Sequence, residues 1–263
     1  MKKKTFYYSE NQEEDFGTLG HSDKPLPKNF KYLHKNIFYR AGSWLLYYLV
    51  ALPILFCYGK IFYGVKVKNR KALKYLKKDK IGCFLYGNHT NNIDAFISHV
   101  FISPRRRSYV ISNAAAVTFN KFIGFLVMQL GCLPIPQTID HGREFKKAME
   151  KRIADGNCIV IYPEAKIWPY YTDVRKFKYT SFKYPVMLNK PVVFFSVTYR
   201  KPKGPFKKIL KPRITVTLSD VIKPDLDIKV NDAALKLSQN CYDFLKTNAK
   251  NNELILYNYV LKK

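Results

Sequence analysis

A histidine and an aspartate five residues apart could together carry out acid–base chemistry. In the run at residues 86–96 (YGNHTNNIDAF), His89 comes before Asp94. On one shared helix the two side chains would point roughly 140° apart, so they meet more easily if His89 lies in a turn and Asp94 in the first turn of a helix. Asp94 could then hold one ring nitrogen of His89 and leave the other as a general base. Taken alone, the pair could also be a strand-end histidine beside a capping aspartate.

The surrounding pattern predicts the elements that would position this pair. Residues 81–86 (IGCFLY) form a short apolar run, which indicates a buried strand. Residues 90–92 (TNN) are good N-cap candidates for a helix over 93–101. His89 would therefore lie just past the end of a strand, a usual place for functional residues in open α/β sheets.

A second carboxylate follows a later strand. Residues 158–162 (CIVIY) predict another buried strand, and Pro163 and Glu164 come directly after it. A glutamate at this place could accept hydrogen bonds from hydroxyl groups or orient a neighbouring base. A solvated loop carboxylate is the alternative interpretation.

Together the two sites resemble those of the glycerolipid acyltransferase family and, more narrowly, those of the lysophosphatidate (1-acylglycerol-3-phosphate) acyltransferases. The resemblance consists of N-H-x-x-x-x-D after one strand and an apolar-Y-P-E run after a later one. Three more blocks are similar: residues 122–136 (FIGFLVMQLGCLPIP), 175–182 (RKFKYTSF) and 190–197 (KPVVFFSV). The resemblance extends from about residue 40 to 200, and the ordered set of blocks is more specific than any single one.

The resemblance implies an O-acyltransferase with an α/β fold. His89 would be the general base that takes the proton from an acceptor hydroxyl while this attacks an acyl thioester, and Asp94 would orient His89. Glu164 would bind the glycerol part of a lysophospholipid acceptor, and the product would be phosphatidate. The donor would be acyl-CoA or acyl carrier protein, a co-substrate, with no cofactor. Glycerol-3-phosphate or another lysophospholipid remains open as acceptor.

The third block departs from the family pattern P-E-G-T-R-S. Ala165 stands where the family has glycine, so a backbone conformation reserved for glycine is not assured, and Ile167 stands at the usual arginine. Phosphate contacts would then come from other basic residues nearby. Lys166, Arg175 and Lys178 are the candidates, although a solvated basic surface explains each of them equally well.

The charge balance indicates an anionic partner. Lysine and arginine total 46 against 19 acidic residues, a formal net charge of +27, and aromatic residues make up 16%. An anionic membrane surface, an acidic acyl donor or a nucleic acid would all suit such a field. No nucleic-acid-binding signature is present, so we expect no nucleic acid partner. A non-catalytic basic module is the alternative from another class.

The N-terminal region predicts membrane association. Residues 1–27 indicate a flexible tail, and 28–40 a basic amphipathic helix. Residues 41–59 carry no charge and have lysine or arginine on both sides, so they could dip into one leaflet as a helix or hairpin, span the bilayer, or form a buried core helix. Residues 28–60 are thus the membrane-associating segment. The lack of a secretory signal indicates the cytoplasmic face.

Residues 61–263 alternate between strand and helix patterns, which predicts a mixed, mostly parallel central sheet flanked by helices. The five cysteines and five histidines form no cluster with metal-ligand spacing, so no metal site is expected. The remaining expected strands are 61–68, 108–112, 132–136, 191–199 and 213–218, and the remaining helices are 70–77, 119–130, 140–154 and 233–247.

Overall fold

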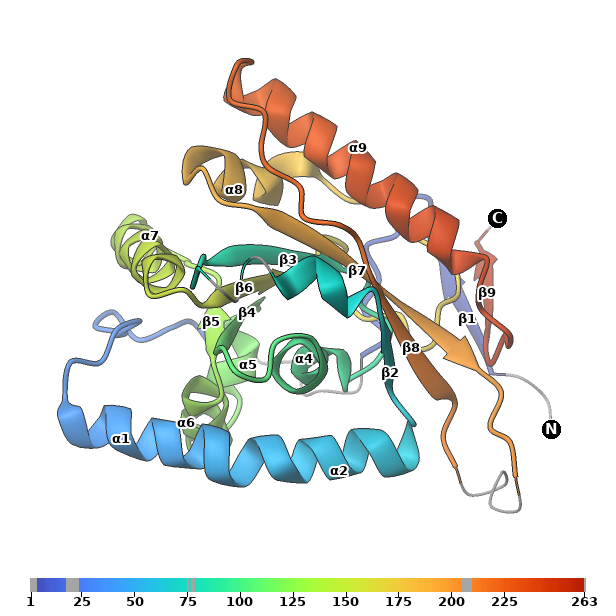
Figure 1. The fold of residues 1–263 in the computed structure, drawn as a ribbon, viewed down its shortest axis with the longest axis horizontal. Coiled ribbons are helices and arrows are strands. Elements are labelled where there is room, and N and C mark those ends of the chain that lie inside the picture. Colours follow the sequence, from blue (N-terminus) through green and yellow to red (C-terminus); the bar gives the residue numbers. More distant parts are fainter. Residues whose placement is uncertain (1–3, 18–23, 75, 77–78, 205–209, 263) are drawn as a thin grey trace.

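A computed structural model describes residues 4–17, 24–74, 76, 79–204 and 210–262. Within these residues a seven-stranded sheet of order β2-β8-β7-β3-β6-β4-β5 has helices on both faces (Figure 1). All neighbouring strands are parallel except β7 and β8, which confirms the predicted sheet type. The strands are β2 (Lys66–Lys68), β3 (Cys83–Gly87), β4 (Ser108–Ser112), β5 (Cys132–Pro134), β6 (Cys158–Ile161), β7 (Val192–Arg200) and β8 (Arg213–Leu218).

The central strands are apolar throughout because their side chains alternate between two cores. Phe84 and Tyr86 of β3 face one cluster, while Cys83 and Leu85 face the other. A strand covered on both faces needs such a continuous apolar run. The helices are α1 (Ile37–Leu45), α2 (Leu52–Phe62), α4 (Asp94–Ile97), α5 (Ala115–Thr118), α6 (Lys121–Gln129), α7 (Ile139–Ala154), α8 (Lys183–Met187) and α9 (Val230–Ala249), with helical turns at Leu46–Ala51, Arg70–Leu73, Ser98–Ile102 and Tyr179–Phe182.

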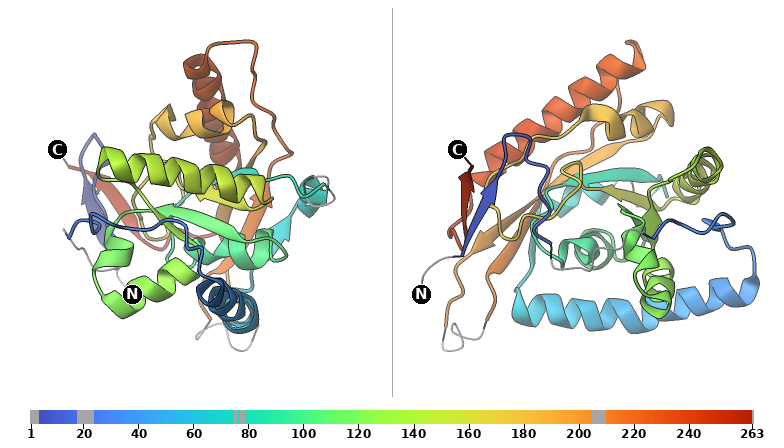
Figure 2. Two further views of the ribbon diagram at one scale, coloured as in Figure 1. Left: turned by 90° about the vertical axis from the view of Figure 1, so that its left-hand side faces the viewer. Right: turned by 180° about the vertical axis from the view of Figure 1, so that it is seen from behind.

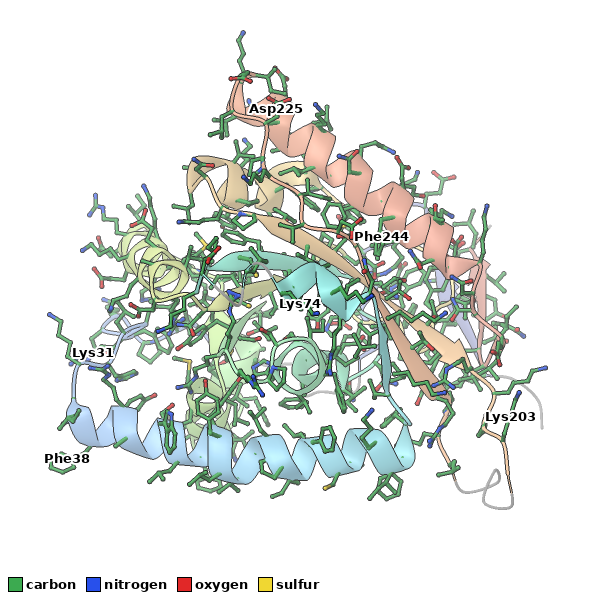
Figure 3. The ribbon with its side chains drawn as sticks, viewed as in Figure 1. Lys31, Phe38, Lys74, Lys203, Asp225 and Phe244 are labelled. Carbon is green, nitrogen blue, oxygen red and sulfur yellow. The ribbon has the colours of Figure 1, made fainter. Side chains whose placement is uncertain are left out.

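One long apolar helix lies along the outside of the domain (Figure 1). It runs from Ile37 to Phe62 through α1, the turn Leu46–Ala51 and α2, and it is long and apolar enough to cross a membrane, with a mean hydropathy of 1.8. Only 11% of its most apolar window is buried. A buried core helix is therefore the wrong interpretation, and the helix is not broken into a hairpin. Figure 3 shows Phe38, which is 83% exposed, pointing away from the body.

The start of this helix differs from the prediction. The sequence predicts an amphipathic helix over 28–40, but the helix begins at Ile37, where the Asn36 side chain caps the amide of Tyr39. The chain before it is instead held against α7, because Tyr32 is buried in the core and its carbonyl accepts a hydrogen bond from Arg152 at 2.8 Å. The apolar spacing of this segment reflects that packing.

Two short strands near the chain ends form a second sheet. β1 (Thr5–Tyr8) pairs in parallel with β9 (Asn258–Leu261), and the two lie side by side in both views of Figure 2. The sequence predicts a flexible tail over 1–27, which is wrong for residues 5–8. Residues 1–3 and 18–23 of that tail lie outside the described residues.

Candidate active site

His89 and Asp94 meet at the carboxyl end of β3. His89 lies in the turn after the strand, and Asp94 is the first residue of α4. His89 Nδ1 is 3.5 Å from Asp94 Oδ2. Asp94 is fully buried, and its Oδ2 also accepts hydrogen bonds from the amides of Thr90 at 2.6 Å and Asn91 at 2.7 Å. These two amides fix the carboxylate, so it faces the imidazole from the predicted position.

Tyr162 contacts both His89 and Asp94. Its ring stacks on the His89 imidazole with centroids 4.3 Å apart, and its hydroxyl donates to the backbone carbonyl of Asp94. Burial raises the pKa of Tyr162 far above its usual value, so the hydroxyl remains a donor. The His89 side chain is 16% exposed although Nδ1 is buried. The exposed part therefore belongs to the other atoms of the side chain.

The turn that holds His89 is fastened to β7. Asn88 donates to the carbonyl of Val197 at 3.0 Å and accepts from its amide at 2.7 Å. The hydroxyls of Thr90 and Tyr199 lie 2.7 Å apart. Side chains on both sides of His89 are thus bonded to a central strand, which keeps the imidazole in one place.

Glu164 reaches the same turn from the end of β6. Its Oε2 accepts from the backbone amide of His89 at 3.4 Å and from the Arg175 guanidinium at 3.0 Å. The Glu164 side chain is fully buried, and burial raises its pKa, while Arg175 opposes that rise. Oε1 has no hydrogen-bond partner among the residues that the structure describes. The structure thus brings both sequence sites together, with one buried carboxylate oxygen of Glu164 left without a partner among the described residues.

The expected phosphate-binding residues lie in different surroundings. Arg175 is buried against Glu164, and its guanidinium also donates to the carbonyl of Lys166. Lys166 is half-buried, and its ammonium bonds to a backbone carbonyl at Glu13, whereas Lys178 is exposed. Of the three, Arg175 is therefore placed to neutralise Glu164 instead of facing solvent.

Ala165 adopts a backbone conformation that favours glycine. Its φ is +64°, in the left-handed region. The turn after Glu164 therefore forms with an alanine at this position, at a cost in strain. Within the described residues, no group of three or more histidine, cysteine, aspartate or glutamate side chains could hold a metal ion.

The comparison with protein families decides the broad class. A family model described as Acyltransferase matches residues 64–199, about half of the chain. The chain belongs to the acyltransferase family. Among curated proteins, none matches it. The crystal structure of the 1-acyl-sn-glycerophosphate (LPA) acyltransferase PlsC from Thermotoga maritima is similar, with 16% identity, a TM-score of 0.56, and coverage of 83% of this chain and 89% of that chain. The two proteins share a fold.

The acyltransferase site contains residues to which the sequence assigned no role. Tyr162 is one, although strand alternation places it on the same face as Val160, toward the cluster that includes the residues around α4. From that alternation one could have predicted that Tyr162 lies close to the turn of His89. Tyr199 is another. Its contacts come from segments far away in the chain, so no local pattern signals it.

Proposed function

We propose that this acyltransferase moves a fatty acyl group from a thioester donor to the free hydroxyl of 1-acylglycerol-3-phosphate, giving phosphatidate. The observation that carries the proposal is the contact between His89 and the buried Asp94 carboxylate, 3.5 Å apart, with Glu164 at the same turn. A partly exposed imidazole backed by a buried carboxylate suits a general base.

In the proposed reaction the acceptor hydroxyl is the nucleophile. Nε2 of His89 takes the hydroxyl proton while the oxygen attacks the thioester carbonyl, and Asp94 stabilises the imidazolium that forms. The tetrahedral intermediate collapses, the carbon–sulfur bond breaks, and the thiolate takes the proton from His89. The sequence contains no G-x-S-x-G nucleophile motif, so direct transfer without an acyl-enzyme is the simpler route.

The acceptor would bind at the Glu164 side of the turn. The unpartnered Oε1 of Glu164 can accept a hydrogen bond from a glycerol hydroxyl. Lys166 and Lys178 are the nearby lysines in sequence that could meet the phosphate, while Arg175 holds Glu164. The similar PlsC structure is that of a 1-acyl-sn-glycerophosphate acyltransferase, which supports this acceptor class.

The site of action would be the cytoplasmic face of an anionic membrane. The helix from Ile37 to Phe62 exposes large apolar side chains, and Phe122 and Phe125 of α6 add to them beside α1. Such a surface inserts well among acyl chains. The net charge of +27 suits anionic headgroups and acidic acyl-CoA or acyl carrier protein.

An acceptor panel with the purified protein on anionic vesicles tests the proposal. Each reaction combines acyl-CoA or acyl carrier protein with lysophosphatidate, glycerol-3-phosphate or lysophosphatidylcholine, and product mass and free thiol are both measured. We expect phosphatidate from lysophosphatidate, with one thiol released per product. Thiol release without an acylated lipid, or acylation of the other acceptors alone, would contradict the proposed acceptor.

A further inference from the structure

Both ends of the chain converge on the loop that follows Glu164. The ring of Trp168 in this loop is fully buried between aromatic residues of the two ends. Tyr259 of β9 stacks on it with centroids 5.1 Å apart and planes at 2°, while Tyr8 of β1 and Phe16 approach to 4.8 and 5.4 Å. All three of these partners lie outside residues 64–199 that match the family.

Hydrogen bonds fasten the loop to both ends as well. The indole Nε1 of Trp168 donates to the carbonyl of Glu14 at 2.7 Å. The hydroxyl of Tyr259 donates to the carbonyl of Pro169 at 2.6 Å. The loop is therefore fixed from two sides by groups that meet only in the folded chain.

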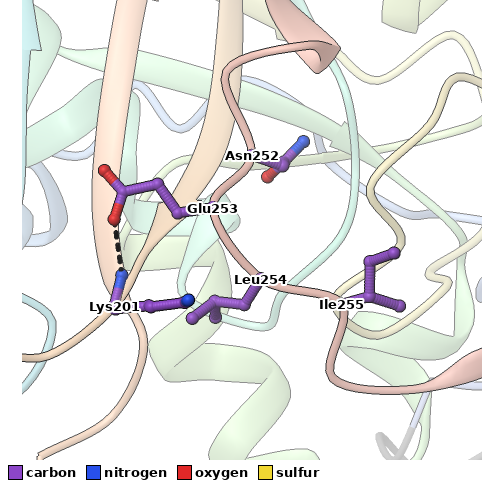
Figure 4. A pocket seen from close by; sticks show the side chains of 5 residues that line it. All are labelled: Lys201, Asn252, Glu253, Leu254 and Ile255. Carbon is purple, nitrogen blue, oxygen red and sulfur yellow. Dashed lines mark hydrogen bonds between the residues drawn. The ribbon is translucent and has the colours of Figure 1, made fainter.

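The C-terminal segment also reaches the strand behind the catalytic turn. Asn252 accepts from the amide of Tyr199 at 2.8 Å, and the amide of Glu253 donates to the Tyr199 carbonyl at 2.9 Å. The Glu253 carboxylate accepts from the amide of Lys201 at 3.1 Å, beside an open hollow (Figure 4). Since Tyr199 contacts Thr90, this segment connects the His89 turn with the Trp168 loop.

Trp168 in turn contacts the partner of Glu164. The Arg175 guanidinium lies over the indole ring, 5.0 Å from its centroid, and donates to Glu164 at 3.0 Å. We propose that the terminal brace, residues 5–16 with 252–261, sets the position of Glu164 through Trp168 and Arg175. These two are positioning residues, because neither needs to touch the acceptor.

This inference rests on the proposed function, in which Glu164 binds the acceptor. The loop is also bonded to the His89 turn, because the amides of Trp168 and Tyr170 donate to the carbonyls of His89 and Thr90 at 3.4 and 2.7 Å. Asn88 holds that turn to β7 independently of the loop, so loosening the brace should move Glu164 more than His89 and Asp94. The effect should therefore fall on the KM for the acceptor, with kcat and the KM for the donor little changed.

A variant with a single tryptophan allows the packing of Trp168 to be measured separately from catalysis. The chain has two tryptophans, Trp44 and Trp168. In a Trp44→Phe background, acrylamide quenching of fluorescence therefore reports on Trp168 alone. Tyr8→Ala and Tyr259→Ala are made in this background, and Tyr7→Ala is the matched control, because Tyr7 is next to Tyr8 on β1 but 57% exposed. Kinetics are run well below the unfolding midpoint of every variant.

We expect Tyr8→Ala and Tyr259→Ala to increase the quenching of Trp168 and to raise the acceptor KM about tenfold, with Tyr7→Ala like its background. Unchanged quenching, or increased quenching with an unchanged acceptor KM, would overturn the brace as a positioning device in an active enzyme. If the unmodified chain acylates none of the acceptors, the proposed function fails and the role of the brace fails with it.

Discussion

The turn around His89 and the loop after Glu164 lie next to each other but are held in different ways. The turn around His89 is fixed by neighbours in sequence and by β7, through Asp94, Asn88 and Thr90. The loop after Glu164 is fixed by the two chain ends and by Arg175, and it meets the turn through two backbone hydrogen bonds, from the amides of Trp168 and Tyr170. The first region lies within the part of the chain that matches the acyltransferase family, and the supports of the second lie largely outside it.

This difference indicates which property each region controls. A turn supported by central strands can keep one geometry for the proton transfer that all substrates share. A loop supported by peripheral segments can change together with those segments. This loop has Ala165 and Ile167 where the family pattern has glycine and arginine. We therefore expect changes in the turn to alter the chemical step, and changes in the loop to alter acceptor binding and stability.

His89→Ala should show the largest effect, because it removes the proposed base. We expect acyl transfer to lysophosphatidate to fall by roughly 10²–10⁴-fold. Vesicle binding and the unfolding midpoint should remain, because the exposed helix is distant in sequence and the Asp94 amide contacts do not involve the imidazole. Initial rates by product mass measure the loss, and retained turnover would contradict the assignment.

Asp94→Asn should give the next largest loss, because it keeps the shape and removes the charge. The amide oxygen can still accept from the Thr90 and Asn91 amides, so the turn should fold. The imidazolium loses its stabilising carboxylate, and we expect kcat to fall about 10²-fold, the lower end for general-base help, with both KM values nearly unchanged. A change confined to KM would assign Asp94 to substrate binding instead.

Arg175→Met should separate the two regions most clearly in stability. It leaves the buried Glu164 carboxylate without its cation, which costs about 3–5 kcal/mol of unfolding free energy. Lys147→Met is the matched control, because the ion pair of Lys147 with Glu144 is exposed at a similar distance of 2.9 Å and should contribute about 0–1 kcal/mol. Urea unfolding of both variants in one detergent measures the two losses of unfolding free energy. Equal losses would contradict a larger contribution from the buried pair of Arg175 and Glu164.

The unfolding free energy of Arg175→Met should also change with pH, in a direction set by the pKa of Glu164. Burial already raises the pKa of Glu164, and Arg175→Met removes the strongest influence that opposes this rise, although the His89 amide still donates to the carboxylate. The folded state then binds a proton that the unfolded chain releases at lower pH, so stability is lost as the pH increases through the raised pKa. As the pH rises above the ordinary pKa of a glutamate, the deficit of Arg175→Met against the unmodified chain should therefore widen. A constant deficit would show that the lost interaction is not with an ionised carboxylate.

The same contrast explains what could be predicted from the sequence. The strand at 213–218, the helix at 140–154 and the contact between His89 and Asp94 follow from local patterns, and the structure has each of them close to the predicted bounds. Their signals are periodic apolar runs and caps within a few residues.

Contacts between distant segments could not be predicted in this way. β1 and β9 are four residues each and pair only with each other across nearly the whole chain. Arg175 lies in a basic run typical of a solvated surface, although its partner Glu164 is only eleven residues away. Its burial depends on the indole of Trp168, which the chain ends in turn cover.

Ala165→Gly should have the smallest effect and the opposite sign. At φ +64° an alanine is strained by about 1–2 kcal/mol, and glycine relieves this while losing about 0.5–1 kcal/mol of chain entropy. We expect a net gain of about 0.5–1 kcal/mol in urea unfolding. Asn189→Gly is the control, since asparagine at φ +46° tolerates that conformation and should gain nothing. A gain at Ala165 with an unchanged acceptor KM would show that the methyl group of Ala165 strains this turn without changing how the acceptor binds.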